Sequence, residues 1–292
     1  MEVGMWSASF NKINTMNDLT AFNKFTHQLP ETGALMPVLF IGHGSPMNGI
    51  EVNEFSSYWA KLATEIPVPS AVVVVSAHWL TRGTRITAMD FPETIHDFGG
   101  FPEALYKVRY AAPGSRELAT TTAALVKSTM VELDHDWGLD HGAWTIIRHM
   151  YPDAKIPVLQ LSIDHTKGPQ YHYDLAAELY ELRKKGVLII GSGNMVHNLR
   201  MVAWDKLNET EYGYDWAQQM NSTFKELIGS GRHDRLINYQ GLGREAQLAV
   251  PTPEHYLPLL YTLGVGKENE SVSFFNDKAV GGSLTMTSVK VG

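Results

Sequence analysis

The chain has 292 residues, of which 44% are hydrophobic, 19% charged and 10% aromatic, a composition typical of a soluble globular protein rather than a disordered, fibrous or membrane-spanning one. Its 31 acidic residues outnumber the 24 basic ones and give a formal net charge of −7, so nothing in the charge favours a nucleic acid partner. The absence of cysteine excludes disulfides, thiolate nucleophiles and cysteine-ligated metals, and leaves histidine, carboxylates and water as metal ligands.

Residues 1–35 are expected to form a weakly structured lead-in to a single catalytic α/β domain over residues 36–292. The lead-in is mixed and polar, with Asn17 and Asp18 as candidate caps of a short helix that would run to Phe25. No window approaches 18 consecutive apolar residues, and the first residues lack a hydrophobic signal segment. The sequence therefore predicts a cytoplasmic location and no contact with a membrane.

Short apolar runs predict buried strands at residues 37–41, 71–76, 156–163 and 187–190. The second run contains four consecutive valines, which suit a strand that is covered on both faces. Helix-like stretches at residues 116–130 and 173–185 alternate with these strands. This alternation predicts an α/β fold with a central, mostly parallel or mixed sheet flanked by helices.

Two further runs near the end of the chain alternate between polar and apolar residues. They cover residues 271–275 and 283–291, and the glycines at 281 and 282 lie between them. We expect an antiparallel pair or edge strands there. We find no internal repeat, and we expect no linker between domains.

Four histidines follow predicted strands or begin a predicted helix, and they are His43, His78, His197 and His255. Ligands of open α/β sheets bind beyond the carboxyl ends of the strands, so we expect these four to meet at one site there. Imidazole is a good ligand for Zn(II) and for Fe(II). The spacings are too long for a compact His-Glu-x-x-His motif, so the residues alone leave structural roles equally open, such as a turn cap or a packed core residue.

Three other histidines, His27, His172 and His233, occur in polar segments and are expected to face solvent. The loop at residues 94–102 is rich in glycine and aromatic residues and suits an aromatic ligand; the alternative is a packed surface loop. Its candidate substrate contacts are His96, Asp97 and Phe101.

His141 precedes a helix-like run, where it could act as a general acid or base. The alternative is that Asp140 caps this helix and that His141 is an incidental neighbour. Other chemistries find less support. The chain has neither a Gly-x-Ser-x-Gly nucleophile elbow nor the glycine-rich motifs that bind phosphates and dinucleotides.

Six segments occur in order along the chain. They are Phe-Ile-Gly-His-Gly-Ser-Pro-Met-Asn at 40–48, Ser-Ala-His-Trp at 76–79, His-Asp-Phe-Gly-Gly-Phe-Pro at 96–102, Leu-Asp-His-Gly-Ala-Trp at 139–144, Gly-Asn-Met-Val-His-Asn-Leu at 193–199 and Pro-Thr-Pro-Glu-His-Tyr-Leu at 251–257. Together they resemble the class III, LigB-like extradiol ring-cleavage dioxygenases, and within that family the bacterial 4,5-DOPA dioxygenase extradiol group. The resemblance extends from about Met36 to the end of the chain.

The resemblance implies one divalent metal ion per chain, held by His43, His78 and His255, with His197 in or against the ligand shell. Glu254 adjoins His255 and is the alternative third ligand. Fe(II) is expected for turnover, because Zn(II) has no accessible redox step. Zn(II) remains a candidate for the bound ion, since a histidine-rich site binds it more tightly than Fe(II).

The reaction implied by the resemblance opens the ring of a catechol such as L-DOPA by 4,5-cleavage and inserts both atoms of O2. The product, 4,5-seco-DOPA, would cyclise to betalamic acid. His141 or His197 would act as the acid–base residue, because imidazole titrates near neutral pH. Two alternatives stay open, namely a zinc-dependent hydrolase with Glu254 as base and a non-catalytic protein that binds metal or catechol.

Overall fold

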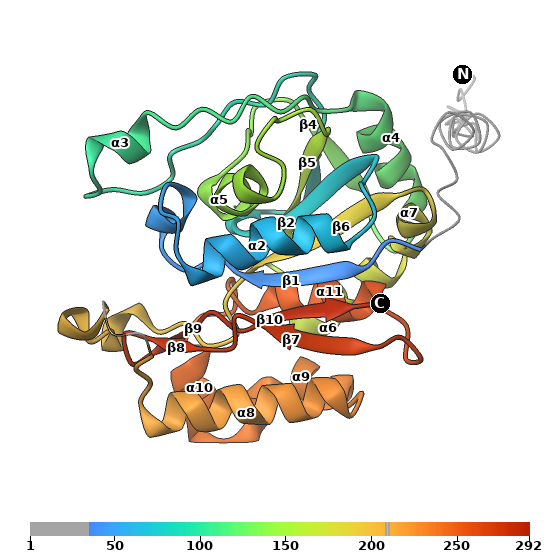
Figure 1. Cartoon of the computed structure of the whole chain (residues 1–292). Coiled ribbons are helices and arrows are strands. Elements are labelled where there is room, and N and C mark those ends of the chain that lie inside the picture. Colours follow the sequence, from blue (N-terminus) through green and yellow to red (C-terminus); the bar gives the residue numbers. More distant parts are fainter. Residues whose placement is uncertain (1–34, 208, 210) are drawn as a thin grey trace, which may run out of the picture.

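An eight-stranded mixed sheet forms the centre of the structure, a computed structural model that describes residues 35–207, 209 and 211–292 (Figure 1). The strand order is β4-β3-β5-β2-β6-β1-β10-β7. The strands are β1 (Val38–Gly42), β2 (Ala71–Thr81), β3 (Thr84–Thr87), β4 (Val131–Asp134), β5 (Val158–Asp164), β6 (Val187–Gly193), β7 (Val272–Phe275) and β10 (Ser288–Val291). A separate two-stranded sheet contains β8 (Ala279–Val280) and β9 (Leu284–Thr285).

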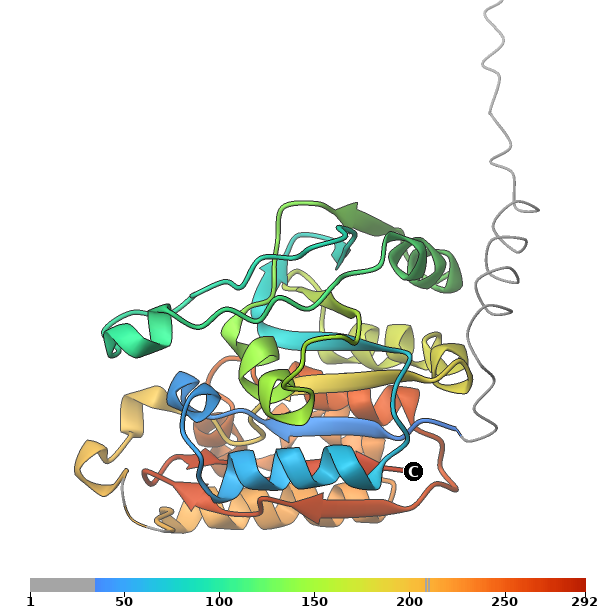
Figure 2. The same cartoon turned by 45° about the horizontal axis from the view of Figure 1, so that its top comes forward.

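The four central strands β5, β2, β6 and β1 run parallel to one another, whereas β10 and β7 add an antiparallel edge. The predicted α/β fold with a mostly parallel or mixed sheet is thereby confirmed, and so is the antiparallel pair near the end of the chain. The carboxyl ends of β1, β2 and β6 lie at the same edge of the sheet, as both views show (Figures 1 and 2). This edge is where an open α/β sheet binds its ligands.

Helices cover both faces of the sheet (Figure 1). The helices are α2 (Glu54–Glu65), α3 (Glu103–Tyr106), α4 (Arg116–Leu125), α5 (His141–Met150), α6 (Pro169–Ala177), α7 (Tyr180–Lys184), α8 (Asp215–Gly229), α9 (His233–Ile237), α10 (Arg244–Ala249) and α11 (Leu257–Val265). Short 3-10 turns are η1 (Pro46–Gly49), η2 (Leu199–Met201), η3 (Trp204–Lys206) and η4 (Tyr239–Leu242).

Alternate residues of the central strands enter two separate cores. In β1, Val38 and Phe40 pack with the core that contains α11, whereas Leu39 and Ile41 pack with the core that contains α2 and α5. Because both faces are buried, the central strands need no polar face, and this explains their continuous runs of valine and isoleucine.

The predicted helices are shorter than the sequence pattern suggests. The stretch at 116–130 forms α4 only to Leu125, after which Val126 is extended and leads into β4. The stretch at 173–185 contains the end of α6, which begins earlier at Pro169, and the whole of α7, and no glycine or proline marks the break between the two helices. Both apolar patterns continue past the helix ends, so periodicity alone does not show where the helices stop.

The prediction that His172 faces solvent is wrong. Its ring is fully buried between α6 and α11, where Nδ1 lies 3.1 Å from the hydroxyl of Tyr261. Leu175 and Ala176, three and four residues further along α6, are buried on the same helix face. His233 is partly buried and lies 2.9 Å from the Tyr173 hydroxyl. His27 lies outside the described residues.

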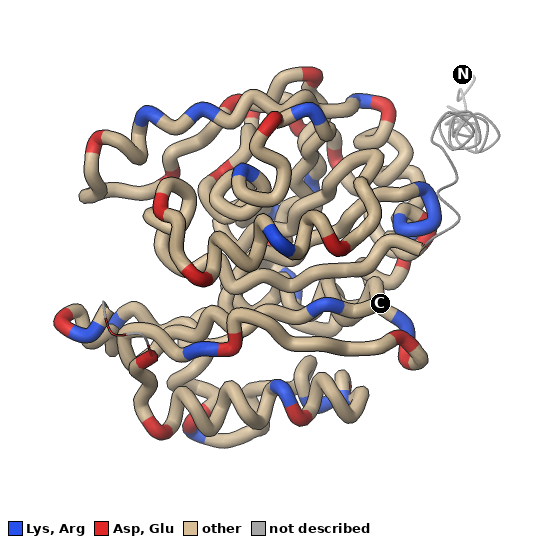
Figure 3. Tube along the Cα trace, in the orientation of Figure 1, with Lys and Arg blue, Asp and Glu red and all other residues tan. Residues whose placement is uncertain are grey.

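The predicted lead-in of residues 1–35, with its helix from 17 to 25, lies outside the described residues except for Leu35, so it stays a prediction. Lys and Arg are interspersed with Asp and Glu over the outer helices and loops (Figure 3). Among the described residues, no helix has both the length and the apolar character required to span a bilayer.

One buried ion pair fixes the start of β1. Arg183 in α7 is fully buried, and its Nη1 and Nη2 donate to the two carboxylate oxygens of Glu270 at 2.7 and 2.5 Å. Its Nε donates to the carbonyl of Met36 at 2.6 Å. Arg183 therefore connects α7, the segment that enters β1 and the loop that precedes β7.

Replacing Arg183 with methionine is expected to lower the free energy of unfolding by about 3 kcal/mol, because a buried charge loses its partner. Burial acts to raise the pKa of Glu270, but the hydrogen bond from Arg183 contributes to a net lowering of that pKa. The stabilisation is therefore complete above the ordinary glutamate pKa of 4.5 and is lost as the pH falls through the lowered pKa.

Urea unfolding followed by circular dichroism at about pH 7 and about pH 3 measures this difference. The difference in the free energy of unfolding between the native protein and Arg183→Met should be smaller at the lower pH. A difference that stays constant would contradict the assignment. Glu65→Gln, which breaks an exposed pair with Lys61, is the control and should have little effect.

Candidate functional site

His43 and His255 are held on either side of the end of β6. The backbone N–H of His43 donates to the carbonyl of Gly193 at 3.1 Å, and the N–H of Asn194 donates to the carbonyl of His255 at 2.9 Å. A Cβ atom on Gly193 would lie 2.1 Å from that His255 carbonyl oxygen. Gly193 is therefore required for the close approach that brings His255 to the sheet edge.

His78 belongs to β2, which continues to Thr81, beyond the predicted end at Ser76. The pairing of β2 with β5 shifts register between Val75 and Leu80, and His78 lies within this irregular stretch. Such irregularities redirect side chains next to functional sites. A Cβ atom on Gly142 would lie 3.0 Å from the His78 ring, so a glycine is needed where α5 begins against β2.

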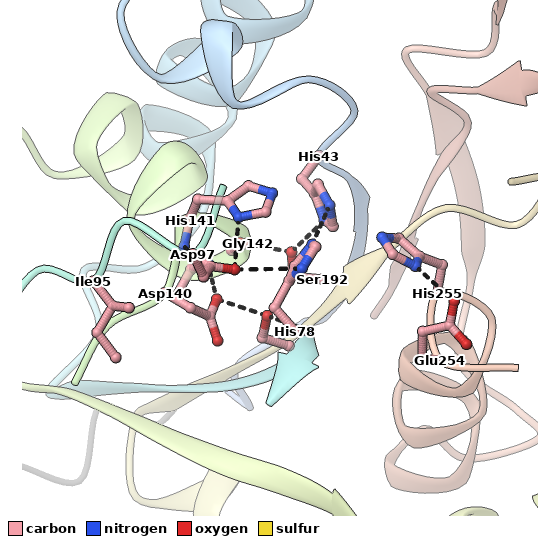
Figure 4. Close-up of polar contacts among 12 residues, drawn as sticks. His43, His78, Ile95, Asp97, Asp140, His141, Gly142, Ser192, Glu254 and His255 are labelled. Carbon is pink, nitrogen blue, oxygen red and sulfur yellow. Dashed lines mark hydrogen bonds and ion pairs between the residues drawn. The ribbon is translucent and has the colours of Figure 1, made fainter. Parts of the chain in front are cut away.

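His141 is the first residue of α5, and Asp140 is the N-cap, whose carboxylate accepts from the N–H of Ala143. Both interpretations of this segment are therefore compatible, since Asp140 caps the helix and His141 still faces the sheet edge. Asp97 accepts from the backbone N–H of His141 at 2.8 Å and contacts its Nδ1 at 2.8 Å. The same carboxylate lies 3.4 Å from Nδ1 of His78 (Figure 4).

The contacts of Asp97 keep its side chain ionised. Burial acts to raise the pKa of Asp97, but the hydrogen bond and charge of His141, together with the charge of His78, leave the pKa below its ordinary value. An ionised carboxylate accepts N–H protons only, so Nδ1 of His141, which faces this carboxylate, bears a proton. Nδ1 of His78 faces the same carboxylate at the longer distance of 3.4 Å, which makes an ion-pair contact rather than a hydrogen bond.

The tautomer of His43 follows from its neighbour Ser192. The Ser192 hydroxyl donates its one proton to the carbonyl of Gly142 at 2.6 Å. It must therefore accept from Nδ1 of His43, which lies 2.9 Å away. The Nε2 lone pair of His43 then faces Nε2 of His78, at a distance of 3.1 Å.

The close approach of the two Nε2 atoms fits two ligands of one metal ion as well as it fits a hydrogen bond between the rings. Burial, followed by the charge of neighbouring histidines, lowers the pKa of His43 well below its ordinary value and that of His78 to about 3. At neutral pH an extra proton between the rings is therefore disfavoured. The separation is less than twice a metal–nitrogen bond of about 2.0–2.1 Å, so both atoms can bind one ion.

Five imidazoles gather around this point. His43 and His78 occupy the middle of the site, with His141 on one side and His255 on the other (Figure 4). The ligand atoms of His43, His78 and His141 lie within 4.8 Å of one another, and so do those of His197, Glu254 and His255. The ring centroid of His255 is 5.4 Å from that of His43 and 5.0 Å from that of His78.

The second group is built on a stacked pair of histidine rings. The rings of His197 and His255 are 3.6 Å apart with an interplanar angle of 10°. Burial lowers the pKa of His197 to about 4 and that of His255 well below its ordinary value, the latter also because of neighbouring histidines. Glu254 lies behind this pair, with Oε1 3.5 Å from Nδ1 of His255 and 2.7 Å from the Thr252 hydroxyl.

The histidines open onto a cavity of about 660 Å³, a volume that accommodates a small aromatic molecule. All four strand-end histidines, His141 and Phe101 line the cavity. His96 and Asp97 are not among its lining residues: Nε2 of His96 lies 3.1 Å from the carbonyl of Val108, and Asp97 contacts the histidines from behind. The cavity is lined by His43, Gly44, Ser45, Pro46, Met47, His78, Gly99, Gly100, Phe101, His141, His197, Leu199, Val202, Trp204, Leu207, His255 and Leu284.

Sequence reasoning missed two features of the site. Ser192 follows the predicted strand at residues 187–190 and was not among the predicted site residues, yet its hydroxyl orients His43. The apolar side chains of residues 199–207 form one wall of the cavity. Their signal was a cluster of large hydrophobic residues directly after His197, in a segment without strand or helix periodicity.

Comparisons with known proteins agree with this geometry. Residues 37–288 match the family model of the catalytic LigB subunit of aromatic ring-opening dioxygenase. A protein of Escherichia coli K12 named 4,5-DOPA dioxygenase extradiol is 47% identical over 262 residues, which cover 88% of this chain and 95% of that protein. A Beta vulgaris protein of the same name is 35% identical over 261 residues, covering 86% and 94% of the two chains.

The fold is also similar to that of a solved structure. The crystal structure of an uncharacterized protein from Escherichia coli K12 superposes with a TM-score of 0.76 and 42% sequence identity. The match covers 88% of this chain and 100% of the other. The family match described above includes every residue that lines the cavity, from His43 to Leu284.

Proposed function

Because the chain belongs to the LigB family of aromatic ring-opening dioxygenases and is a metal-dependent extradiol dioxygenase, we propose that it opens the ring of a catechol such as L-DOPA by 4,5-cleavage. The observation that supports this most directly is the convergence of five imidazoles from separate segments of the chain on the wall of one cavity. The family match favours this reaction over the hydrolysis and the simple binding that the sequence left open.

His43, His78 and His255 are the proposed metal ligands, with His197 against them. His255 lines the cavity, whereas Glu254 does not and already accepts from Thr252, so His255 is the better third ligand. A divalent metal bound there would supply the positive charge that favours an ionised catechol and, as Fe(II), the electron transfer that O2 requires. Fe(II) is the proposed ion for turnover, and Zn(II) is the alternative bound ion.

His141 is the proposed general base. Its Nε2 faces the cavity side of the cluster, where it would accept a proton from a catechol hydroxyl and return it later in the reaction. Asp97 would stabilise the resulting imidazolium through the bond to Nδ1, so Asp97 acts as a positioning residue rather than as a substrate contact. His197 is the alternative acid–base residue, although its ring is stacked on His255.

Phe101 is the proposed contact for the aromatic ring, since it lines the cavity and packs edge-to-face against Phe98. His96 would support this loop from behind, because it contacts Phe98 and the carbonyl of Val108. The proposed product of L-DOPA cleavage is 4,5-seco-DOPA, which contains both atoms of O2 and cyclises to betalamic acid. The cytoplasmic location stays a prediction.

The protein is first reconstituted with Fe(II) under anaerobic conditions, and air and L-DOPA are then added. We expect it to consume O2 and L-DOPA in equal molar amounts. A yellow ring-opened product should accumulate at the same rate, because ring opening inserts both oxygen atoms into one molecule. An oxygen electrode and absorbance spectroscopy measure these quantities. The zinc-loaded protein should bind the catechol and consume no O2, since Zn(II) has no redox step.

Two results would overturn the proposal. One is the absence of O2 uptake with every catechol tested, although iron is bound stoichiometrically. The other is O2 uptake without ring opening, which mass spectrometry of the product would reveal as a quinone with no added oxygen.

A further inference from the structure

The cavity has a histidine floor and an apolar wall, with no charged side chain among its described lining residues. We call the side chains of Leu199, Val202, Trp204 and Leu207 the apolar wall. Met47, Pro46 and Phe101 add further apolar surface. A catechol bound to the floor would therefore place its ring substituent among apolar groups.

The two cationic residues of the segment 199–207, Arg200 and Lys206, do not line the cavity. Lys206 donates to Glu209 at 2.6 Å and lies 5.8 Å from the ring centroid of Tyr212. Arg200 is exposed and does not line the cavity, although both of its neighbours in η2 are hydrophobic. Since no Lys or Arg is among the described lining residues, a substrate carboxylate would find no counter-ion on the cavity wall.

The apolar wall is itself incompletely covered. Leu199 is 56% exposed and Trp204 is 69% exposed, unusual values for such large hydrophobic side chains. An apolar ring substituent would remove this surface from water and gain about fourfold in affinity for each buried methylene. A carboxylate or ammonium group would instead lose part of its hydration and gain no charged partner from the wall.

We propose that the preferred substrate is a catechol with an uncharged, apolar ring substituent, and that the apolar wall determines this preference. The inference rests on the proposed function and makes it more specific. It places L-DOPA, which has two charges on its side chain, among the poorer substrates of this site.

Matched catechols test the proposal, because 4-propylcatechol and 3-(3,4-dihydroxyphenyl)propionate differ chiefly in one carboxylate. Dissociation constants are measured by calorimetry on the metal-loaded protein without oxygen, and kcat/KM by O2 uptake. We expect 4-propylcatechol to bind at least about tenfold more tightly than the propionate or L-DOPA, since the charged groups lose hydration. The kcat/KM values should follow the same order.

Variants of the wall assign the preference to residues. Trp204→Ala should weaken the binding of 4-propylcatechol by about tenfold while catechol itself changes little, because only the substituent reaches the wall. Phe91→Ala, an equally exposed aromatic residue elsewhere (81% exposed), is the matched control and should change neither ligand. Leu207→Arg should reverse the ranking in favour of the propionate by supplying a counter-ion.

Two outcomes would overturn the inference. The first is that L-DOPA or the propionate binds more tightly than 4-propylcatechol. If Arg200→Gln then removes this tighter binding, Arg200 is the residue that pairs with the substrate carboxylate. The second is that Trp204→Ala leaves the order of the ligand affinities unchanged but alters the oligomeric state in gel filtration. The apolar wall would then be an interface between protein chains. The order of the ligand affinities tests the inference even if no catechol is cleaved. A failure of the inference can therefore be distinguished from a failure of the proposed function.

Discussion

His43→Ala is expected to remove both metal binding and ring cleavage. His43 contributes the Nε2 atom that faces His78 at 3.1 Å, and Ser192 fixes its orientation from the other side. Changes in the partners of metal ligands already cost about 10–100-fold in metal affinity, so loss of a ligand should cost at least about a hundredfold. Iron per chain after dialysis, measured by plasma mass spectrometry, and O2 uptake should fall together.

The matched control is His165→Ala, which removes an exposed histidine that does not line the cavity. It should retain both the metal and the activity. The circular dichroism spectrum and melting temperature of His43→Ala show whether the variant folds. A folded His43→Ala protein that binds iron stoichiometrically and cleaves catechol would exclude His43 from the metal site.

The fold was predictable from the sequence wherever burial alone decides the structure. The four central strands are continuous apolar runs because helices cover both of their faces, and such runs are visible in a single sequence. The ends of α4 and α6 were not predictable, because the apolar pattern continues where the backbone turns away. His172 was misassigned for a related reason, since only the packing of α11 shows which face of α6 is covered.

The candidate site was predictable at the level of strand ends, because the carboxyl ends of parallel strands meet at one edge. This rule gathers His43, His78, His197 and His255 into one cavity. The roles within the cluster depend on contacts between distant segments, such as the Asp97 carboxylate that holds His141. No spacing in the sequence encodes such contacts, so Asp97 was assigned to the substrate rather than to the histidines.

Hydrogen bonds orient two rings of the cluster. Ser192 binds Nδ1 of His43 and Asp97 binds Nδ1 of His141, while the same Asp97 carboxylate lies 3.4 Å from Nδ1 of His78. The buried carboxylate of Asp140 secures this frame, because it accepts from the Ser76 hydroxyl at 2.7 Å and from Gln160 Nε2 at 2.6 Å. Metal ligands are commonly oriented in this way by the partners of their second nitrogen.

His141→Gln separates the general base from the metal ligands. Glutamine preserves a hydrogen-bonding side chain at the start of α5 but cannot accept the catechol proton at neutral pH. General-base catalysis contributes about 10²–10⁴-fold, so we expect kcat to fall by about that factor with iron still bound at one ion per chain. Steady-state O2 uptake and plasma mass spectrometry on the same samples measure the two quantities.

Asp97→Asn distinguishes positioning from proton transfer in the same site. The amide still accepts one hydrogen bond from His141, but it loses the negative charge that would stabilise an imidazolium. We therefore expect a smaller fall in kcat than for His141→Gln, and no further fall when the two substitutions are combined, because they act on one proton transfer. If His141→Gln instead loses its iron, His141 is a metal ligand together with His43 and His78, whose ligand atoms lie within 4.8 Å of its own. The base would then have to be His197. It is the one histidine among the described lining residues of the cavity that is neither in this group of three nor the proposed ligand His255.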